Sequence, residues 1–177
     1  TIRTSTNGTS WTSQSSGTSS HLQGVAYGDG LWVVVGNSGW ILTSTNGTSW
    51  ASRTSGTSYN LWSIAYGDGR WVAVGNYGTI LYSPNATSWT PCTSGTSSDL
   101  RDVAYGDGLW VAVGGDGTIL VSPNGYTWTP RDSSTSEHLY GIAYSSERLW
   151  DTPPWVAVGT SGAIVTAQII TLYNPLG

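Results

Sequence analysis

The chain has 177 residues, the size of one compact domain, and only 9% of them are charged, for a formal net charge of −4. Because it has six arginines and no lysine, it lacks the basic stripe that a nucleic-acid partner requires and the positive charge that an anionic membrane attracts. No apolar run approaches the roughly 20 residues of a membrane-spanning helix, so we expect no nucleic-acid partner and no membrane insertion.

The composition instead indicates a secreted β protein. Ser, Thr, Asn and Gly dominate the polar residues, and the first residue is Thr1 rather than Met, which fits the removal of a signal segment. We therefore expect an extracellular or cell-surface location. The single cysteine, Cys92, cannot form a disulfide within the chain. We expect an unreactive thiol there, and pairing between two molecules is the alternative.

The chain is a tandem repeat with a period of 39 residues. The tryptophans that mark the period are Trp11, Trp50, Trp89 and Trp128. Within one period we expect four short strands, because Gly, Asn, Asp or Pro interrupts runs of Val, Ile, Trp, Tyr and Thr. In the first full repeat these runs are 22–27, 32–35, 40–44 and 48–52. No window has the apolar spacing of a helix, so the protein is predicted to be all-β.

Four short strands in about 40 residues are the signature of a β-propeller blade. We therefore expect a single propeller domain over residues 1–167, with four four-stranded blades of about 39 residues each. The repeats are 15–53, 54–92, 93–131 and 132–167, and the segment 1–14 precedes them.

The two ends of the chain are out of phase with the blades. Residues 1–14 supply a third and a fourth strand, whereas the last repeat ends after its third strand. The N-terminal strand around Trp11 is therefore expected to complete the last blade, within the chain or in a neighbouring subunit; the second arrangement gives a ring of several chains or a filament. The tail 168–177 is expected to be an extra strand or an assembly arm. The enlarged loop 145–154 marks a terminal repeat or makes a specific contact.

The turn between the third and fourth strands carries a family resemblance. Residues 43–50, Thr-Ser-Thr-Asn-Gly-Thr-Ser-Trp, and their counterparts 5–11, 83–89 and 122–128 resemble the Asp-box of sialidase-like and related propellers, with Asn in the Asp position. Taken whole, residues 1–167 are similar to short-blade propellers such as the photosystem II assembly factors, and this resemblance implies the fold. A sialidase would need an arginine cluster and a Tyr/Glu pair. The six arginines are instead scattered over different strands and loops, which argues against that activity.

Other catalytic and metal-binding patterns are equally weak. His21 and His138 share one repeat position with Asn60 and Asp99, and a ring of such residues could in principle bind a metal. These residue types also suit solvated loops, which is the reading we favour. Neither a Gly-x-Ser-x-Gly elbow nor a glycine-rich phosphate loop is present. We therefore expect no enzyme activity, no metal and no cofactor.

The most variable repeat positions are predicted to lie on one face. In a propeller, the loops from the fourth to the first strand and from the second to the third strand emerge together. Aromatic rings that stack on sugars and polar groups that bind hydroxyls are mixed at these positions. The candidate ligand-binding residues are Gln23, Asn37, Tyr59, Trp62, Tyr77, Arg101 and Tyr140.

Three equivalent turns carry Asn-x-Thr acceptors for N-glycosylation, at Asn7, Asn46 and Asn85. Asn-Gly is also a good turn, so a structural role is the alternative. From these features we predict a non-enzymatic extracellular structural or adhesive subunit that self-associates through its terminal strands, up to a filament. The alternative is a lectin-like carbohydrate-binding module that uses the variable face, with glycans or surface proteins as partners.

Overall fold

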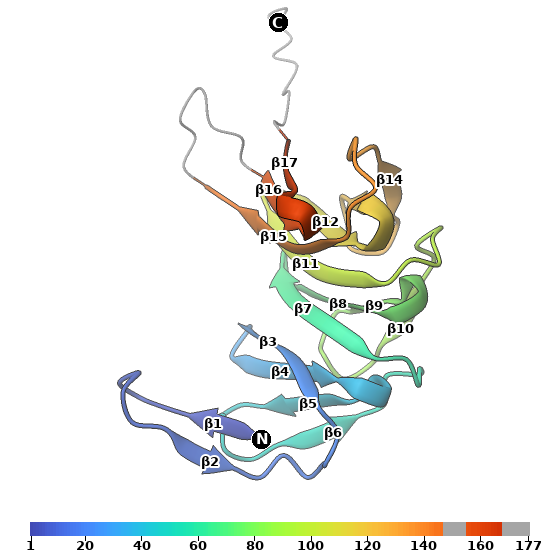
Figure 1. The fold of residues 1–177 in the computed structure, drawn as a ribbon. Coiled ribbons are helices and arrows are strands. Elements are labelled where there is room, and N and C mark those ends of the chain that lie inside the picture. The colour runs from blue at the N-terminus through green and yellow to red at the C-terminus, as the bar shows by residue number, and fades with distance from the viewer. Residues whose placement is uncertain (147–154, 168–177) are drawn as a thin grey trace, which may run out of the picture.

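The computed structural model describes residues 1–146 and 155–167 (Figure 1). Within these residues the chain forms antiparallel strands joined by turns, including short 3-10 turns, and no α-helix, which confirms the all-β prediction. No helix in this part of the chain has the length and apolar character to cross a membrane. The residues 147–154 of the enlarged loop and the tail 168–177 lie outside the described residues, so the expectations for them stay predictions.

Three complete blades form the middle of the molecule, each a sheet of four antiparallel strands in sequence order. Blade 1 consists of β3 (Leu22–Gly28), β4 (Leu31–Gly36), β5 (Ile41–Ser44) and β6 (Ala51–Arg53). Blade 2 consists of β7 (Leu61–Gly67), β8 (Arg70–Gly75), β9 (Ile80–Ser83) and β10 (Thr90–Cys92). Blade 3 consists of β11 (Leu100–Gly106), β12 (Leu109–Gly114), β13 (Ile119–Ser122) and β14 (Thr129–Arg131). The predicted repeat of four strands is confirmed.

The two ends are incomplete blades, as the phase of the repeats predicts. Blade 4 has three strands, β15 (Leu139–Tyr144), β16 (Trp155–Gly159) and β17 (Ile164–Ala167). The N-terminal hairpin, β1 (Ile2–Thr4) and β2 (Thr12–Gln14), forms a sheet of its own. In Figure 1 this hairpin and blade 4 lie at opposite ends of a row of blades. Among the described strands none pairs with the outer edge of β17, so the predicted closure within one chain is not formed in this structure.

The hairpin between the first two strands of each blade turns on an Asp-Gly pair. In blade 1, Asp29 and Gly30 have φ angles of 47° and 71°. Positive φ at both central residues is the requirement of a type I′ turn, which Asp and Gly tolerate better than other residues. The repeated Gly-Asp-Gly segment is therefore explained by turn geometry.

The turn between the third and fourth strands is held by its own side chains. In blade 1, Ser44 Oγ accepts the N–H of Gly47 at 2.9 Å, and Asn46 Oδ1 accepts the N–H groups of Thr48 and Ser49, both at 2.9 Å. The indole of Trp50 donates to the carbonyl of Gly47 at 3.0 Å. Asn therefore does what the Asp of an Asp-box does. Because the turn includes Thr48 and Ser49, β6 begins three residues later than the sequence predicts.

Apolar residues fill the space between blades rather than the inside of any one sheet. Between blades 1 and 2, Val33, Val35 and Ile41 pack against Leu61 and Ile64. Equivalent clusters join blade 2 to blade 3 and blade 3 to blade 4. The predicted packing role of the tryptophans that open the second strands is confirmed at Trp71, Trp110 and Trp155, which are buried.

The close contact between blades predicts that replacing Gly67 destabilises the fold. A Cβ on Gly67 would lie 2.2 Å from Cγ of Tyr105 in the next blade, whereas a Cβ on Gly141 would meet its nearest atom, in Val158, at 3.4 Å. We expect Gly67→Ala to lower the free energy of unfolding by about 2–3 kcal/mol, because the ring of Tyr105 must move. Gly141→Ala, the control, is expected to cost less than about 1 kcal/mol. Urea denaturation followed by tryptophan fluorescence measures both, and equal midpoints would contradict this account.

Candidate functional site: the loop face and the two end faces

The loop face is the side of the molecule where 3-10 turns join the second and third strands. These turns are η1 (Asn37–Gly39), η2 (Asn76–Gly78), η3 (Gly115–Gly117) and η4 (Thr160–Gly162). The central residue of each turn is in the left-handed region, with φ between 53° and 56°. This conformation directs the central N–H of η1, η2 and η3 toward the following blade.

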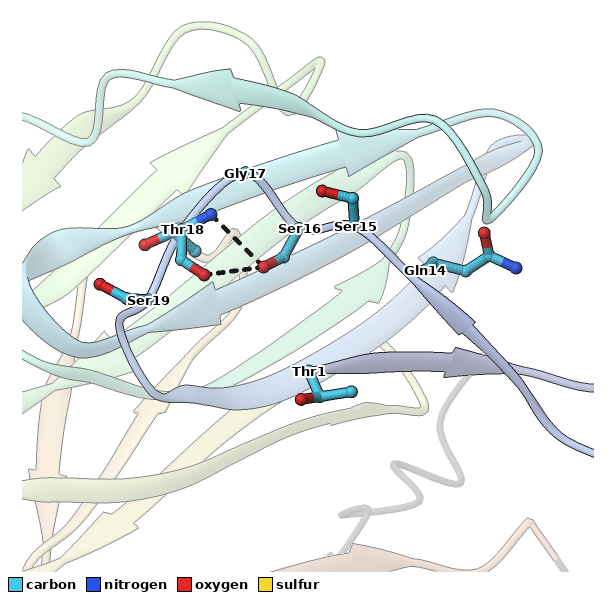
Figure 2. A pocket seen from close by; sticks show the side chains of 7 residues that line it. All are labelled: Thr1, Gln14, Ser15, Ser16, Gly17, Thr18 and Ser19. Atoms are coloured by element: carbon cyan, nitrogen blue, oxygen red, sulfur yellow. Dashed lines mark hydrogen bonds between the residues drawn. The ribbon is translucent and has the colours of Figure 1, made fainter.

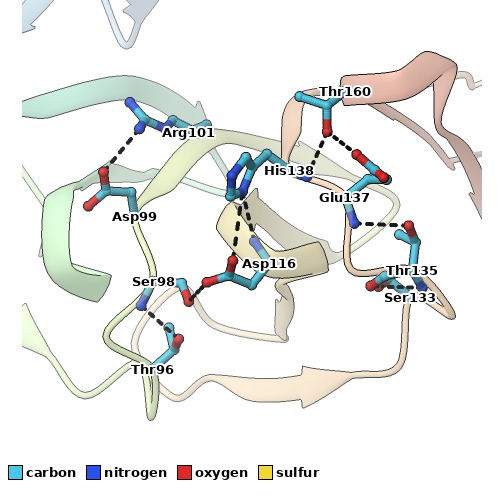
Figure 3. Close-up of polar contacts among 10 residues, drawn as sticks. All are labelled: Thr96, Ser98, Asp99, Arg101, Asp116, Ser133, Thr135, Glu137, His138 and Thr160. Carbon is cyan, nitrogen blue, oxygen red and sulfur yellow. Dashed lines mark hydrogen bonds and ion pairs between the residues drawn. The ribbon is translucent and has the colours of Figure 1, made fainter.

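The residue before each first strand accepts that N–H. Asn60 Oδ1 accepts the N–H of Ser38 at 2.9 Å, and Asp99 Oδ1 accepts that of Tyr77 at 2.9 Å. His138 Nδ1 accepts the N–H of Asp116 at 3.1 Å (Figure 3). The favoured reading of these positions as solvated loop residues was therefore incomplete. They are hydrogen-bond acceptors that join one blade to the one before it. The sequence signal was present, since His, Asn and Asp are all acceptors at the same repeat position.

Electrostatics strengthen the contact at Asp99. Partial burial alone would raise the pKa of its carboxyl group, but bonds from the Asn76 side chain and the Tyr77 N–H, together with the nearby Arg101, outweigh it. The pKa of Asp99 is therefore held below its ordinary value of 3.8. Arg101 approaches the second carboxylate oxygen at 3.0 Å.

A cluster of polar groups lies where blade 4 begins (Figure 3). The hydroxyl group of Thr160 donates to the carboxylate of Glu137 and accepts the N–H of His138. The hydroxyl groups of Thr160 and Ser161 lower the pKa of Glu137 because they stabilise its ionised form. The amide of Gly117 in η3 donates to the carbonyl of Glu137 at 2.9 Å. The backbone carbonyl of Glu137 therefore joins blade 4 to blade 3, whereas its carboxylate bonds within blade 4.

Sequence reasoning missed the carboxylate that joins three blades. Asp102 lies on β11 and accepts a hydrogen bond from Ser63 of blade 2 at 2.7 Å. Its other oxygen accepts the N–H of Ile142 in blade 4 at 3.0 Å. The equivalent positions hold Gly24, Ser63 and Gly141, so no repeated pattern marked Asp102.

The structure places the predicted ligand-binding residues on the loop face, but largely in pairs. Four of them are the extra residue of a β-bulge in a first strand: Gln23, Trp62, Arg101 and Tyr140. The guanidinium carbon of Arg101 lies 4.9 Å from the Trp62 ring centre, and Gln23 donates to Asn37 at 2.9 Å. The rings of Tyr59 and Tyr77 are 5.0 Å apart and both are exposed.

The tyrosine pair borders a shallow, open hollow. Its lining continues over Thr79 to Leu81 and Pro91 to Ser97, so that β9, β10 and the following loop form its floor. Cys92 lies in this floor, and burial raises the pKa of its thiol to about 11. The thiol is therefore almost entirely protonated at neutral pH, which supports the expectation that it is unreactive. Among the described residues no three His, Cys, Asp or Glu side chains are placed to hold a metal ion.

The two end faces expose residues that internal joints cover. Val25 is 60% exposed, whereas its counterparts Ile64 and Val103 are 6% and 4% exposed and Ile142 is partly buried. At the other end Ile164 is 70% exposed, although Ile41 is fully buried and Ile119 is partly buried. Trp32 and Val158 are 39% and 47% exposed. The first face of blade 1 and the last face of blade 4 therefore each present apolar surface that the described residues leave uncovered.

The loop before blade 1, residues 15–19, is shown in Figure 2. Residues 15–19, with Thr1 and Gln14, line a hollow, and Ser16 Oγ donates to the carbonyl of Thr18. In the internal joints the equivalent loop holds the glycine of the preceding 3-10 turn, so closely that a Cβ on Gly78 would lie 2.1 Å from the carbonyl of Thr96. Among the described residues nothing lies within 4 Å of a Cβ placed on Gly162 of η4. In this part of the chain the loop 15–19 and η4 therefore lack the contact that the internal joints make.

One position of blade 4 departs from the repeat. Gly28, Gly67 and Gly106 each lie against a tyrosine of the next blade, where a Cβ would come within about 2.2 Å of the ring. Ser145 stands at this position in blade 4. A blade that packs on this end must therefore place its tyrosine, the exposed Tyr27, differently from the internal joints.

Comparisons with solved structures agree with the propeller fold. The chain is similar to YCF48 from Cyanidioschyzon merolae, with 17% identity and a TM-score of 0.61 over 81% of this chain and 51% of that one. It is similar to YCF48 bound to D1 peptide, with 20% identity and a TM-score of 0.58 over 82% of this chain and 48% of that one. It is also similar to the computationally designed Ika4 protein, with 16% identity and a TM-score of 0.68 over 86% of this chain and 93% of that one.

These likenesses are of fold. The chain spans about half the length of the YCF48 structures and nearly all of the designed protein. No protein-family model matches the sequence. No curated protein matches it either. The resemblance to photosystem II assembly factor-like propellers, predicted from the repeats, is thus confirmed at the level of the fold.

The joint at Asp99 predicts a pH dependence. Because its folded pKa lies below the unfolded value, ionised Asp99 contributes stability above the unfolded pKa, and this is lost as the pH falls through the folded pKa. Asp99→Asn keeps an acceptor for Tyr77, as Asn60 does for Ser38, but removes the charge. We expect the variant to be less stable at pH 6 and to approach the wild type as the pH falls from about 4 to 2. Urea denaturation midpoints of the two proteins across this pH range test the prediction. If the difference between the midpoints does not narrow as the pH falls, the role of the charge is contradicted.

Proposed function

We propose that the chain is a non-enzymatic structural subunit that associates end to end with further copies of itself, in an extracellular or cell-surface setting. The observation that carries the proposal is the exposure of Val25 and Ile164 on opposite ends, at positions that the internal joints bury. An internal joint shows how the two ends fit, because both ends are made from the same repeat.

The apolar surface of the two ends contributes to association. Burying a fully exposed valine, isoleucine or larger apolar side chain stabilises by about 1.5–3 kcal/mol. Val25, Trp32, Val158 and Ile164 are 60%, 39%, 47% and 70% exposed, so covering what remains would contribute about 3–6 kcal/mol in total. That overlaps the lower part of the roughly 4–15 kcal/mol that association costs in lost freedom of motion. Polar contacts between η4 and the hollow at residues 15–19 then decide the net affinity.

The internal joints specify these polar contacts. By analogy with Asp116 and His138, Ser161 of one copy would donate its N–H to His21 of the next. By analogy with Gly117 and Glu137, Gly162 would donate to the carbonyl of Ser20. Of the four residues at this repeat position, His21 has no 3-10 turn before it among the described residues, since blade 1 follows the N-terminal hairpin.

Two further features support this role. The carboxylates of Asp99 and Asp102 accept hydrogen bonds from neighbouring blades, which favours a structural over a catalytic purpose. Asn7, Asn46 and Asn85 are exposed on equivalent turns, where N-linked glycans would leave the end faces free. The proposal includes a filament built by repeated end-to-end contact and an adhesive role for that assembly.

The mass of the particle in solution tests the proposal. We expect light scattering at micromolar concentration to give multiples of 18.7 kDa for the wild type. Val25→Asp should shift the particle to a single chain, because a carboxylate would be buried without a partner. Thr129→Asp, an exposed change on the outer strand of blade 3, is the matched control and should leave the mass unchanged. A wild type that stays at one chain across all concentrations would overturn the proposal.

A lectin-like role of the loop face is the second candidate, favoured by the exposed ring pair of Tyr59 and Tyr77. One similar structure is that of YCF48 bound to D1 peptide, so a peptide is the other ligand class to test. If the face binds sugars, a glycan array should give hits whose affinity falls at least tenfold in the Tyr59→Ala, Tyr77→Ala double variant. Tyr126→Ala, an exposed tyrosine on a strand-3 to strand-4 turn, is the control. Binding only to a peptide library would exclude the lectin, and binding to neither would exclude this candidate.

A further inference from the structure

The third strand of a blade is present twice where two copies would meet. Ile2 of β1 lies 39 residues before Ile41 of β5, and Ile164 of β17 occupies the same repeat position. The fourth strand is present once, as β2. A blade formed from blade 4 of one copy and the N-terminal hairpin of the next therefore has five strands for four places. One of the two third strands, β1 or β17, must leave.

Packing decides which strand stays. The second residue of each third strand faces the preceding blade. In blades 2 and 3 these residues, Leu81 and Leu120, are almost fully buried against valines of that blade. Val165 of β17 packs in the same way against Val111 and Val113 of blade 3. The residue of β1 at this position is Arg3, which is exposed. Placing Arg3 against these valines would bury a guanidinium group without a partner, which is strongly unfavourable.

We propose that β17 of one copy displaces β1 from the edge of β2 in the next copy, so that β1 is a temporary strand. This inference rests on the proposed end-to-end association and identifies the strand that must be released. In the free chain β1 covers the inner edge of β2, and an uncovered edge would pair with unrelated strands.

The exchange conserves the hydrogen bonds along the edge. β1 pairs with β2 through Ile2 with Gln14, Arg3 with Ser13, and Thr4 with Thr12. The joint between β5 and β6 has the same register, because Ile41 pairs with Arg53 and Thr43 with Ala51. β17 would therefore place Ile164 opposite Gln14 and Thr166 opposite Thr12.

A side-chain contact is conserved as well. Gln14 Nε2 donates to Thr4 Oγ1 at 2.9 Å, and in blade 1 Arg53 donates to Thr43 Oγ1 at the same distance. Thr166 offers the same hydroxyl group on β17. Because the polar contacts are replaced one for one, the burial of Ile164 and Val25 drives the exchange.

A reversible lock on β1 tests the inference. In a Cys92→Ser background, Thr4→Cys with Thr12→Cys puts two cysteines on directly opposed residues of β1 and β2. Oxidation should join them and hold β1 in place, so we expect association, measured by light scattering, to weaken at least tenfold. Reduction of the same sample should restore the association of the Cys92→Ser parent, which also shows that the variant folds.

The reciprocal cross-link detects the product. Thr12→Cys and Thr166→Cys are made in separate Cys92→Ser chains, which are mixed under reducing conditions and then oxidised. We expect a disulfide-linked pair containing one chain of each kind, at several times the yield obtained with Val121→Cys in place of Thr166→Cys. Val121 is the equivalent position in blade 3, where β14 already covers the edge.

Failure of this inference and failure of the proposed function are distinguishable. If the wild type associates and the oxidised Thr4, Thr12 variant associates equally well, end-to-end contact stands and the strand exchange is overturned. If the mixed cross-link does not exceed the Val121→Cys control, the exchange is likewise overturned. If the wild type is a single chain at every concentration, the proposed function fails, and the exchange fails with it.

Discussion

The contact between successive blades is the interaction on which the rest of the structure depends. A four-stranded sheet of short strands is too small to bury its own apolar side chains, and Val33, Val35 and Ile41 of blade 1 become inaccessible only because blade 2 covers them. Each blade is therefore stable through its neighbours, as in other repeat proteins. Because of the same dependence, apolar side chains such as Val25 and Ile164 stay exposed at the two ends, where the described residues supply no complete neighbouring blade.

A polar layer on the loop face complements the apolar joints. The left-handed residues of the 3-10 turns present their N–H groups to the next blade, where Asn60, Asp99 or His138 accepts them. Any side chain that places an acceptor atom within hydrogen-bond distance can accept this N–H. These positions therefore vary among three residue types and keep the same role. Variation among repeats, which favoured a ligand-binding face in the sequence, is thus partly explained by chemical equivalence within the fold.

The sequence predicted the fold well because it contains four copies of one pattern. The strands, the Gly-Asp-Gly turns and the incomplete ends all follow from glycine spacing and from the phase of the tryptophans. It predicted the site less well, because contacts between blades join residues of different repeats. Asp102 has no counterpart among its three equivalents, so its bonds to Ser63 and Ile142 could not be read from a repeated pattern. Arg101 and Trp62 were predicted as separate ligand contacts and instead face each other.

The proposed assembly depends on the difference between two strands at the same repeat position. β1 carries Arg3 where the third strand of a complete blade has an apolar residue, and β17 carries Val165, which packs against blade 3. The backbone pairing of β1 with β2 has the register of β5 with β6, so Arg3 leaves this pairing intact while it disfavours β1 in a complete blade. In the proposed exchange this one charged residue decides which of the two strands is released.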